Sequence, residues 1–436
     1  MKDMLVALAD GERMGQVAVS GGRLSFCYDS DWQTAGSTFP LSFSMPLAVA
    51  EHGHRVTEAF LWGLLPDNGS VLERWGRRFQ VSSRNPFRLL QHVGEDCAGA
   101  VQFVRPERVD ELLGMAESAS VRWLDKEELA GRIAAVVEDA SATRLGGDTG
   151  QFSLAGAQPK TALYFNAKTE RWGVPEGRTP TTHILKPATG AFAGHVENEH
   201  FCLRLAAHLG LATARSWVMQ CGEIPVIVIE RFDRLEKAGM IRRIHQEDFC
   251  QAAGIRPQLK YQNQGGPSPK TIGEILWTFS TSPREDALRF GESLIFNWLT
   301  AGTDAHAKNY SVLIAAGSRA RLSPLYDLAS AVPYPQQIQP RKATLAMKVG
   351  SHYRIQEIRI RDWSTIAREL RLSPGEIIDR IGDMADRISV GSRVVANSLE
   401  KEGINHPVVR TLAASLPLHV EGCLQNWGDA AKLPPK

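Results

Sequence analysis

The segment Gly302-Thr303-Asp304-Ala305-His306-Ala307-Lys308-Asn309 carries the strongest signal in the 436-residue chain. It is polar, yet it lies between two apolar runs, Leu294–Leu299 and Ser311–Ile314. Asp304 and Asn309 are five residues apart, the spacing of kinase catalytic loops, in which the Asp orients or deprotonates the attacking hydroxyl group and the Asn holds Mg²⁺. The segment therefore predicts a catalytic loop for phosphoryl transfer.

The residues after this loop supply a second candidate metal ligand. Two strand-like runs, Ser311–Ile314 and Arg321–Leu325, are followed by Tyr326-Asp327. A carboxylate that follows a short hairpin occupies the place of the second Mg²⁺ ligand of a kinase. We therefore expect Asn309 and Asp327 to hold the metal ion.

A lysine that pairs with the ATP phosphates is expected on a strand upstream of the loop. Lys186 ends the β-branched and apolar run Thr181–Lys186. Glu199 follows thirteen residues later, near the start of a predicted helix, and is the candidate for an ion pair that fixes the lysine. Glu197 is an equally charged neighbour, so this choice between the two acids stays open.

Two further segments complete the order of parts found in kinases. Ser153–Lys160 (SLAGAQPK) is a loop of small residues whose backbone N–H groups can cradle phosphate. Val228–Asp233 ends an apolar strand in charged residues, as a hinge that offers backbone groups to adenine would. The chain contains neither G-x-x-x-x-G-K-[ST] nor G-x-G-x-x-G, so a P-loop NTPase is not indicated.

Composition places the chain among ordinary globular proteins. Hydrophobic residues make up 43% and charged residues 22%, and the net charge is only +2, which argues against a globally basic nucleic-acid binder. The six cysteines form no C-x-x-C pair, so neither a zinc ribbon nor a dense disulfide framework is supported, and a reducing compartment is expected. With no signal-peptide core and no long apolar run, we expect a cytoplasmic protein that does not span a membrane.

The pattern of turns and apolar residues predicts an α+β fold. Short strands separated by turns dominate residues 1–50, and helices dominate beyond residue 240. A helix is expected over residues 58–79 and another over residues 123–139, starting near Asp125. Ser282 and Ser373 are expected to cap two of those helices, each followed by Pro at the first helical position. We divide the chain into residues 1–106, a β-rich subdomain; 107–235, an N-lobe with phosphate loop and hinge; and 236–436, a helical C-lobe.

These motifs together resemble the HipA family, the serine/threonine kinase toxins of bacterial type II toxin–antitoxin modules. The resemblance rests on SLAGAQPK (153–160), PTTHILK (180–186), ERFDR (230–234), GTDAHAKN (302–309) and LYD (325–327). It extends to LSFSMP (41–46), LLPD (64–67) and VGEDCAGAV (93–101), and so covers nearly the whole chain. It implies a two-lobed protein-kinase-like fold with an extra N-terminal β subdomain.

The resemblance implies a role for each motif residue in a kinase that uses ATP and Mg²⁺. Asp304 would be the catalytic base, Lys186 the phosphate contact, and His306 a group near the phosphates. Ser153 falls on the autophosphorylated serine of the family, where phosphate would expel the loop and silence the kinase. Pro159 departs from the acid usual in that loop. The remaining nucleotide contacts would come from Ala155, Gly156, Ala157, Gln158, Lys160, Glu230, Arg231, Phe232, Lys308 and Tyr326.

The resemblance also implies partners. The substrate would be an aminoacyl-tRNA synthetase, typically the glutamyl enzyme, whose phosphorylation arrests translation and growth and favours persistence. A helix-turn-helix antitoxin would neutralise the kinase and bind operator DNA with it as corepressor. Residues 341–371 hold eight Lys or Arg against three Asp or Glu, a local basic surface suited to DNA phosphates or merely to solvent. Its candidate DNA contacts are Arg354, Arg359 and Arg361.

Two other functions are compatible with the same motifs. The chain could act as a kinase-inactive, DNA-bound corepressor scaffold, although intact Lys186, Asp304, Asn309 and Asp327 argue against this. It could also be a small-molecule phosphotransferase, for which a similar Asp-x₄-Asn loop would serve. The tryptophans at 62, 75, 298 and 363 are expected in the core.

Overall fold

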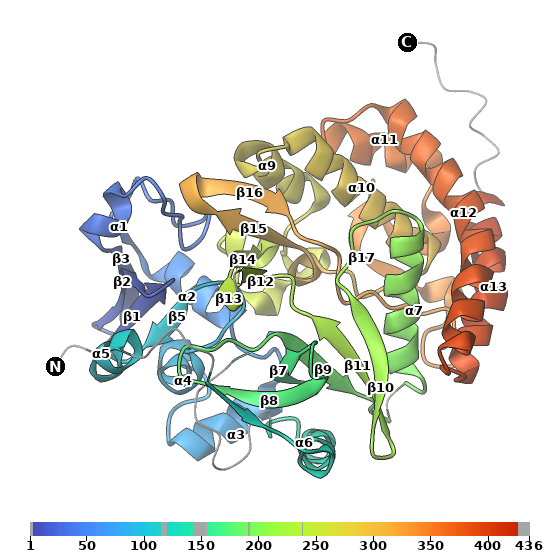
Figure 1. Ribbon diagram of the computed structural model, residues 1–436. Coiled ribbons are helices and arrows are strands. Elements are labelled where there is room, and N and C mark those ends of the chain that lie inside the picture. Colours follow the sequence, from blue (N-terminus) through green and yellow to red (C-terminus); the bar gives the residue numbers. More distant parts are fainter. Residues whose placement is uncertain are drawn as a thin grey trace. The chain divides into compact units, whose positions relative to one another are not determined.

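The chain folds into two compact units, each assembled from several segments (Figure 1). The computed structural model describes residues 3–114, 120–142, 153, 155–190, 192–237 and 239–425. The first unit comprises Met1–Pro187, Met219–Leu259 and Ser311–Ala320; the second comprises Ala188–Val218, Lys260–Tyr310 and Arg321–Lys436. The three-part division expected from the sequence, with boundaries at residues 106 and 235, follows the motifs and stays a prediction.

The first unit begins with an antiparallel sheet of order β4-β3-β2-β1-β5. Its strands are β1 (Met4–Ala9), β2 (Glu12–Ser20), β3 (Arg23–Tyr28), β4 (Glu51–His52) and β5 (Gln102–Val104). The Asp10-Gly11 turn has positive φ at both residues, 50° and 83°, which matches the right-handed twist of a hairpin. The expected hairpins of the N-terminal region are confirmed.

Four helices lie between β3 and β5 in the sequence: α1 (Ser30–Thr34), α2 (His54–Gly63), α3 (Gly69–Phe79) and α4 (Pro86–Val93). The single helix expected over residues 58–79 is wrong, because α2 ends at Gly63 and α3 starts only at Gly69. Asn68 caps α3 by accepting a hydrogen bond from the Ser70 N–H. The intervening segment Leu64–Asp67 thus lies between the two helices and outside both.

A six-stranded sheet of order β10-β11-β9-β7-β8-β6 carries the predicted phosphate-binding lysine. Its strands are β6 (Ser120–Trp123), β7 (Thr161–Asn166), β8 (Arg171–Glu176), β9 (His183–Pro187), β10 (Ser216–Cys221) and β11 (Ile224–Glu230). Helix α6 (Lys126–Glu138) confirms the helix expected to start near Asp125, and a capping box formed by Asp125 and Glu128 begins it. Helix α5 (Pro106–Gly114) lies between β5 and β6 in sequence.

Smaller elements complete the first unit. A hairpin joins β12 (Arg234–Lys237) to β13 (Met240–Arg243), and β14 (His245–Asp248) leads into the short helix α8 (Phe249–Ala252). Strand β15 (Ser311–Ala315) pairs with β14, and β16 (Arg319–Leu322) runs on into the second unit. Five-residue strand β15 thus follows directly on the predicted catalytic loop.

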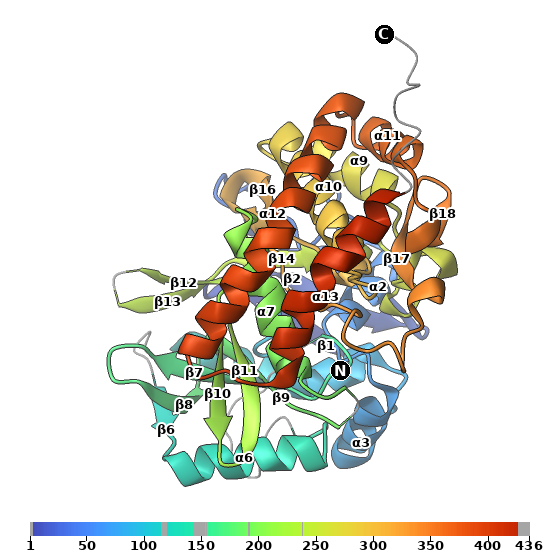
Figure 2. The same cartoon turned by 90° about the vertical axis from the view of Figure 1, so that its right-hand side faces the viewer.

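The second unit is mainly helical (Figure 2). Its helices are α7 (His195–His208), α9 (Pro269–Phe279), α10 (Pro283–Leu299), α11 (Ile360–Glu369), α12 (Pro374–Lys401) and α13 (Pro407–Leu424), with the hairpin β17 (Thr344–Val349) and β18 (His352–Arg354). Helices α12 and α13 run side by side. Both α10 and α12 have Pro at their start as expected, but neither Ser282 nor Ser373 makes a side-chain cap hydrogen bond.

Tight packing confirms the expected core tryptophans. Trp298 and Trp363 are almost fully buried and their rings lie 5.3 Å apart in the second unit, while Trp62 and Trp75 are buried in the first. Cys97, Cys202, Cys221, Cys250 and Cys423 are free and buried, as expected of small core residues. Across the described ranges, no helix is long and apolar enough to cross a membrane.

Candidate active site

The end of helix α10 fixes the start of the predicted catalytic loop. The Gly302 N–H donates to the Asn297 carbonyl oxygen at 2.7 Å. A Cβ atom on residue 302 would lie 2.1 Å from Asn297 Oδ1, so only glycine fits this close turn. Asn297 is itself held, since its Nδ2 donates to the Ser293 carbonyl and to the Tyr310 hydroxyl oxygen.

Within the loop, Asp304 and Asn309 are tied together. Asn309 Nδ2 donates to the Asp304 backbone oxygen at 2.9 Å, and the Asn309 N–H donates to the His306 carbonyl at 2.9 Å. The amide oxygen Oδ1 of Asn309 has no hydrogen-bond partner among the described residues. The loop therefore presents the Asn309 atom that a hard cation such as Mg²⁺ would bind.

Tyr261 orients the Asp304 carboxylate. Its hydroxyl donates to Asp304 Oδ1, and its ring packs edge-on against His306 with 5.1 Å between the ring centroids. Asp304 is exposed, and its other oxygen, Oδ2, has no hydrogen-bond partner in the part of the chain that the structure describes. One carboxylate oxygen is thus held by Tyr261, while the other has no hydrogen-bond partner among the described residues.

The Leu325–Asp327 segment is anchored within the second unit. The Leu325 N–H donates to the Ala212 carbonyl, and the Leu325 carbonyl accepts from the Ala214 N–H, both at 2.8 Å. The Tyr326 hydroxyl donates to the Lys308 carbonyl at 2.8 Å. Asp327 adopts a φ of 57°, which is strained for a residue other than glycine and is typical of functional positions.

The first unit presents the second group of predicted residues. Lys186 lies on β9, opposite Ile227 of β11, and is only 7% exposed. Glu230, the last residue of β11, pairs in register with His183 of β9. Glu199 lies on α7 of the second unit, where both it and Glu197 are buried rather than solvated, and its ion pair with Lys186 stays a prediction.

The phosphate loop docks on the Leu64–Asp67 segment of the N-terminal subdomain. Ser153 is fully buried, and its hydroxyl donates to the Leu64 carbonyl at 2.8 Å. Gly156 forms a parallel bridge to Pro66, and its carbonyl accepts from the Asp67 N–H at 3.1 Å. The subdomain therefore holds the loop at two points.

The loop is also closed on itself. Lys160 Nζ donates to the Ala155 carbonyl at 2.7 Å, across Gly156. Gly156 has a φ of 109°, and a Cβ atom there would lie 2.3 Å from Lys160 Nζ. The positive backbone angle thus requires glycine, whereas the flexible lysine side chain could move aside. Ala157 is exposed, while Gln158 is half-buried.

A buried ion network joins the ERFDR motif to the N-terminal subdomain. The carboxylate of Asp96 contacts Arg234 at 3.0 Å, Arg243 at 3.2 Å and Arg231 at 3.8 Å, while Asp233 pairs with Arg231 and Arg234. Burial would raise the pKa of Asp96, but the three guanidinium groups hold it well below its usual range. Burial, together with neighbouring Arg231, lowers the pKa of Arg234 to about 10.

Arg231 is held at several points inside this network. Arg231 is only 4% exposed. Its guanidinium group donates to the Asp233 carboxylate, the Thr181 hydroxyl oxygen and the Cys97 carbonyl. Its backbone N–H donates to Thr182, and its carbonyl accepts from the Arg234 N–H. Because each of these groups is engaged inside the unit, Arg231 holds the motif in place, and its expected contact with ATP stays a prediction. Glu230 and Phe232, its neighbours, keep that expected role as predictions.

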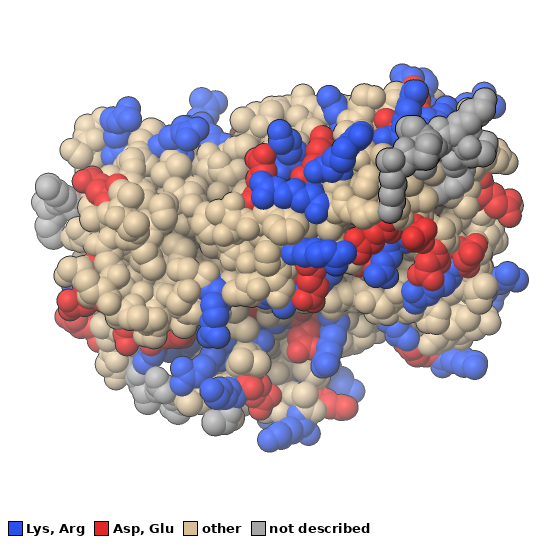
Figure 3. All heavy atoms as spheres, turned by 90° about the horizontal axis from the view of Figure 1, so that it is seen from above, with Lys and Arg blue, Asp and Glu red and all other residues tan. Residues whose placement is uncertain are grey.

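The basic segment 341–371 mixes its charges with acids. Arg354 pairs with Glu357 at 3.0 Å, and Arg359 donates to the backbone carbonyls of Gln356 and Ile358. Arg361 is exposed. Figure 3 shows the face that carries α11, where Lys and Arg are interspersed with Asp and Glu. The three arginines stay candidates for contacts to phosphate.

Several contacts of the site could not be predicted from the sequence. Tyr261 lies 43 residues before Asp304, and Asp96 lies 138 residues before Arg234. Neither Tyr261 nor Asp96 stands in a local spacing that points to its partner. Only the presence of Asp96 in the VGEDCAGAV motif could have marked it as a site residue.

Two family models match separate parts of the chain. The model described as "HipA-like C-terminal domain" matches residues 152–391, and the model described as "HipA N-terminal domain" matches residues 5–104. The first match alone spans more than half of the sequence.

Individual proteins agree with these matches. The chain is 35% identical over 407 residues to "Putative kinase Y4mE" of Sinorhizobium fredii, covering 91% of this chain and 94% of that protein. It is 32% identical over 325 residues to the serine/threonine-protein kinase toxin HipA of Shewanella oneidensis, covering 70% of each. A solved structure of the Shewanella oneidensis HipA, HipB and operator DNA complex matches with a TM-score of 0.81 and 26% identity, covering 99% of this chain and 100% of that one. The two-lobed, kinase-like α+β fold expected from the sequence is confirmed.

Proposed function

The chain belongs to the HipA family, and from this premise we propose that it is a serine/threonine protein kinase that uses ATP and Mg²⁺. The observation that carries the proposal is the Asp304–Asn309 loop. There, one side-chain hydrogen bond ties the two residues and leaves Asp304 Oδ2 and Asn309 Oδ1 without partners among the described residues. Phosphoryl transfer in kinases needs these two roles, a carboxylate oxygen that accepts the proton and an amide oxygen that binds the metal ion.

The residues of the second unit fit a Mg²⁺ ion bound with nucleotide. Mg²⁺ is usually held by one or two carboxylates plus substrate phosphates, rather than by a complete protein cage. Asn309 Oδ1 and the Asp327 carboxylate match that donor set, and no cluster of three or more His, Cys, Asp or Glu side chains suited to a metal occurs within the described ranges. Bound Mg²⁺–ATP would supply the phosphoryl group and a charge that stabilises its transfer.

The protein's own groups would then position and activate the hydroxyl. Tyr261 holds Oδ1 of Asp304, so Oδ2 accepts the proton of the substrate serine or threonine hydroxyl. Lys186, on a rigid strand, places its ammonium group at the phosphates, with Ala155–Lys160 and His306 beside them. Glu230 and Phe232 contact adenine. Catalysis by such a site depends mainly on positioning and on charge stabilisation.

The finer parts of the proposal rest on the family. The substrate is an aminoacyl-tRNA synthetase, with the glutamyl enzyme as first candidate, and its phosphorylation stops translation in the cytoplasm. Ser153 is the autophosphorylation site; its complete burial supports a regulatory role, because a phosphate group cannot stay in that position without displacing the loop. A HipB-like helix-turn-helix antitoxin binds the kinase, and together they repress their operator.

The proposal is tested first by nucleotide binding. Titration calorimetry with Mg²⁺–ATP should show binding to the wild-type chain and a loss of roughly tenfold or more in affinity for Lys186→Ala, since one charge-assisted contact is removed. Lys168→Ala, which removes an exposed lysine of the β7–β8 turn, is the matched control and should bind like wild type. Failure of the wild-type chain to bind would favour the corepressor-scaffold function.

A further inference from the structure

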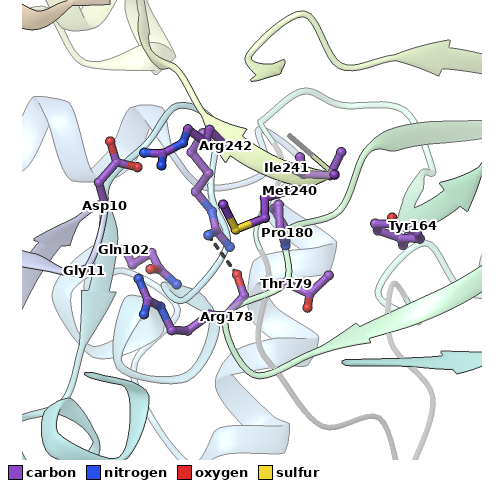
Figure 4. Close-up of a pocket in the computed structure, with 12 residues that line it drawn as sticks. Asp10, Gly11, Gln102, Tyr164, Arg178, Thr179, Pro180, Met240, Ile241 and Arg242 are labelled. Carbon is purple, nitrogen blue, oxygen red and sulfur yellow. Dashed lines mark hydrogen bonds between the residues drawn. The ribbon is translucent and has the colours of Figure 1, made fainter. Parts of the chain in front are cut away.

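A pocket of about 250 Å³ opens in the first unit (Figure 4). Its walls are the Asp10-Gly11 turn, the Arg178–Pro180 segment and the whole of strand β13, with Tyr164 at one side. None of the residues assigned to ATP lines it. It therefore belongs neither to the proposed nucleotide site nor to the catalytic loop.

The charge of the pocket is positive. Arg178, Arg242 and Arg243 line it against one acid, Asp10. Arg243 is immobilised, since it contacts Asp96 at 3.2 Å and donates to the Arg178 carbonyl at 3.0 Å. It belongs to the buried network in which three guanidinium groups share two carboxylates, so its charge is only partly neutralised. A fixed, incompletely paired arginine is a preorganised site for an anion.

Arg242 adds a guanidinium group that is available to a ligand. It is exposed, and its side chain makes no hydrogen bond or ion pair with any residue of the described segments. In Figure 4 its guanidinium group points to the same end of the pocket as Arg178, Gln102 and the single acid Asp10. The opposite end carries Ile241 and Tyr164. The pocket therefore has a cationic end and an apolar end.

The backbone of β13 identifies the shape of the ligand. Successive side chains of a strand point to opposite faces, so a pocket lined by the four consecutive residues Met240–Arg243 faces the edge of the strand. In the described chain, β12 is the single strand neighbour of β13.

The hydrogen-bond pattern of the hairpin leaves that edge open. The Ile244 N–H donates to the Asp233 carbonyl at 2.9 Å. Hydrogen-bonded and non-hydrogen-bonded pairs alternate along an antiparallel hairpin, so the next hydrogen-bonded pairs are Leu235–Arg242 and Lys237–Met240. Ile241 and Arg243 consequently direct their backbone N–H and C=O groups away from β12. An extended peptide is the ligand whose own backbone can pair with such an edge.

We propose that strand β13 and its arginine pocket bind an extended, acidic peptide segment of a partner protein. The peptide pairs with the open edge at Ile241, places a carboxylate side chain between Arg178 and Arg242, and lays an apolar side chain against Tyr164 and Met240. The proposal does not depend on the kinase activity, because binding uses residues outside the proposed nucleotide site.

The test uses the full chain and a synthetic library of capped octapeptides randomised at every position. Peptides retained by immobilised wild-type protein should be enriched in Asp and Glu over Lys and Arg at least about threefold, and Arg242→Glu should abolish that enrichment. Arg84→Glu is the matched control, because Arg84 is exposed in the same unit, lies outside the pocket and forms no ion pair; it should behave like wild type. Circular dichroism should show both variants folded.

A second arm tests the pairing with the strand edge. In the same library N-methylated at every second residue, the peptides keep their charges, but the backbone N–H groups along one edge of each peptide are lost as donors. Retention should therefore fall roughly tenfold, because the backbone hydrogen bonds to β13 cannot form. Equal retention of the methylated library, equal enrichment by wild type and Arg242→Glu, or no acidic enrichment would each overturn the proposal. So would binding of an oligothymidylate at the pocket that displaces the acidic peptides, since it would assign the arginines to nucleic acid.

Discussion

Three arginines and two aspartates decide how the ERFDR motif is held. The Asp96 carboxylate accepts hydrogen bonds from the Thr181 N–H at 3.0 Å and from the Thr181 hydroxyl at 2.7 Å. It also contacts Arg234 and Arg243. Every one of these groups is buried or nearly so, and water cannot replace a lost partner. The stability of the first unit therefore depends on the completeness of this network.

Asp96→Asn should destabilise the protein by about 3–5 kcal/mol, because three guanidinium groups would share a single carboxylate away from water. Urea unfolding followed by tryptophan fluorescence measures the change. Asp3→Asn is the control, since Asp3 pairs with Arg88 on the surface, and its loss should cost less than about 1 kcal/mol. Equal effects of the two variants would show that the network contributes no more than a surface ion pair.

Tyr261 is a positioning residue for Asp304, through the hydrogen bond to Oδ1. Tyr261→Phe should lower kcat of phosphotransfer roughly tenfold, the worth of one hydrogen bond to a charged group, and leave KM for ATP unchanged. Tyr353→Phe in the same unit is the control. A change in KM alone would assign Tyr261 to nucleotide binding instead.

At the scale of elements, local signals predicted local structure. The start of α6 was predictable because the capping box needs only Asp125 and Glu128. The break between α2 and α3 was missed because Leu72, Trp75 and Phe79 continue a helical apolar stripe on the far side of Pro66. The order of the catalytic motifs was predictable, whereas the docking of Gly156 on Pro66 joins segments far apart in sequence and left no periodic signal.

Strand β14 meets the Leu41–Pro46 loop through a buried acid. Glu247 accepts from Ser42 Oγ at 2.5 Å and from the Phe43 N–H at 2.8 Å. Burial raises its pKa from the ordinary 4.5 to about 8, despite the two hydrogen bonds, which lower it. The folded chain therefore retains a proton at neutral pH that the unfolded chain releases.

The consequence is a stability that falls with rising pH. Between about pH 4.5 and about pH 8 the unfolded state binds fewer protons at this site, so the free energy of unfolding decreases as pH rises. Glu247→Gln removes this contribution. As pH rises through that window, the unfolding free energy of wild type should fall relative to that of the variant by up to about 1 kcal/mol per pH unit. Parallel pH profiles of the two proteins would contradict the assignment.

At the scale of the whole molecule, the candidate residues of the proposed reaction are divided between the two units. Lys186, the phosphate loop and Glu230 come from the first unit, while Asp304, Asn309 and Asp327 come from the second. The family could be predicted from the sequence because its motifs are short, contiguous and numerous. Which segments make up each unit could not be predicted from the sequence, because the chain crosses between the units several times. Contacts, and not sequence order, define the units.

Phosphotransfer by the intact chain tests the central claim most directly. Dephosphorylated protein is incubated with Mg²⁺–ATP and examined by intact mass and peptide mapping, beside Asp304→Asn, which keeps the Oδ1 acceptor for Tyr261 but loses the base. Wild type should gain one phosphate at Ser153, and the variant should gain none while it still folds and binds ATP. Equal phosphorylation of both proteins, or none in either, would contradict a kinase in which Asp304 is the catalytic base.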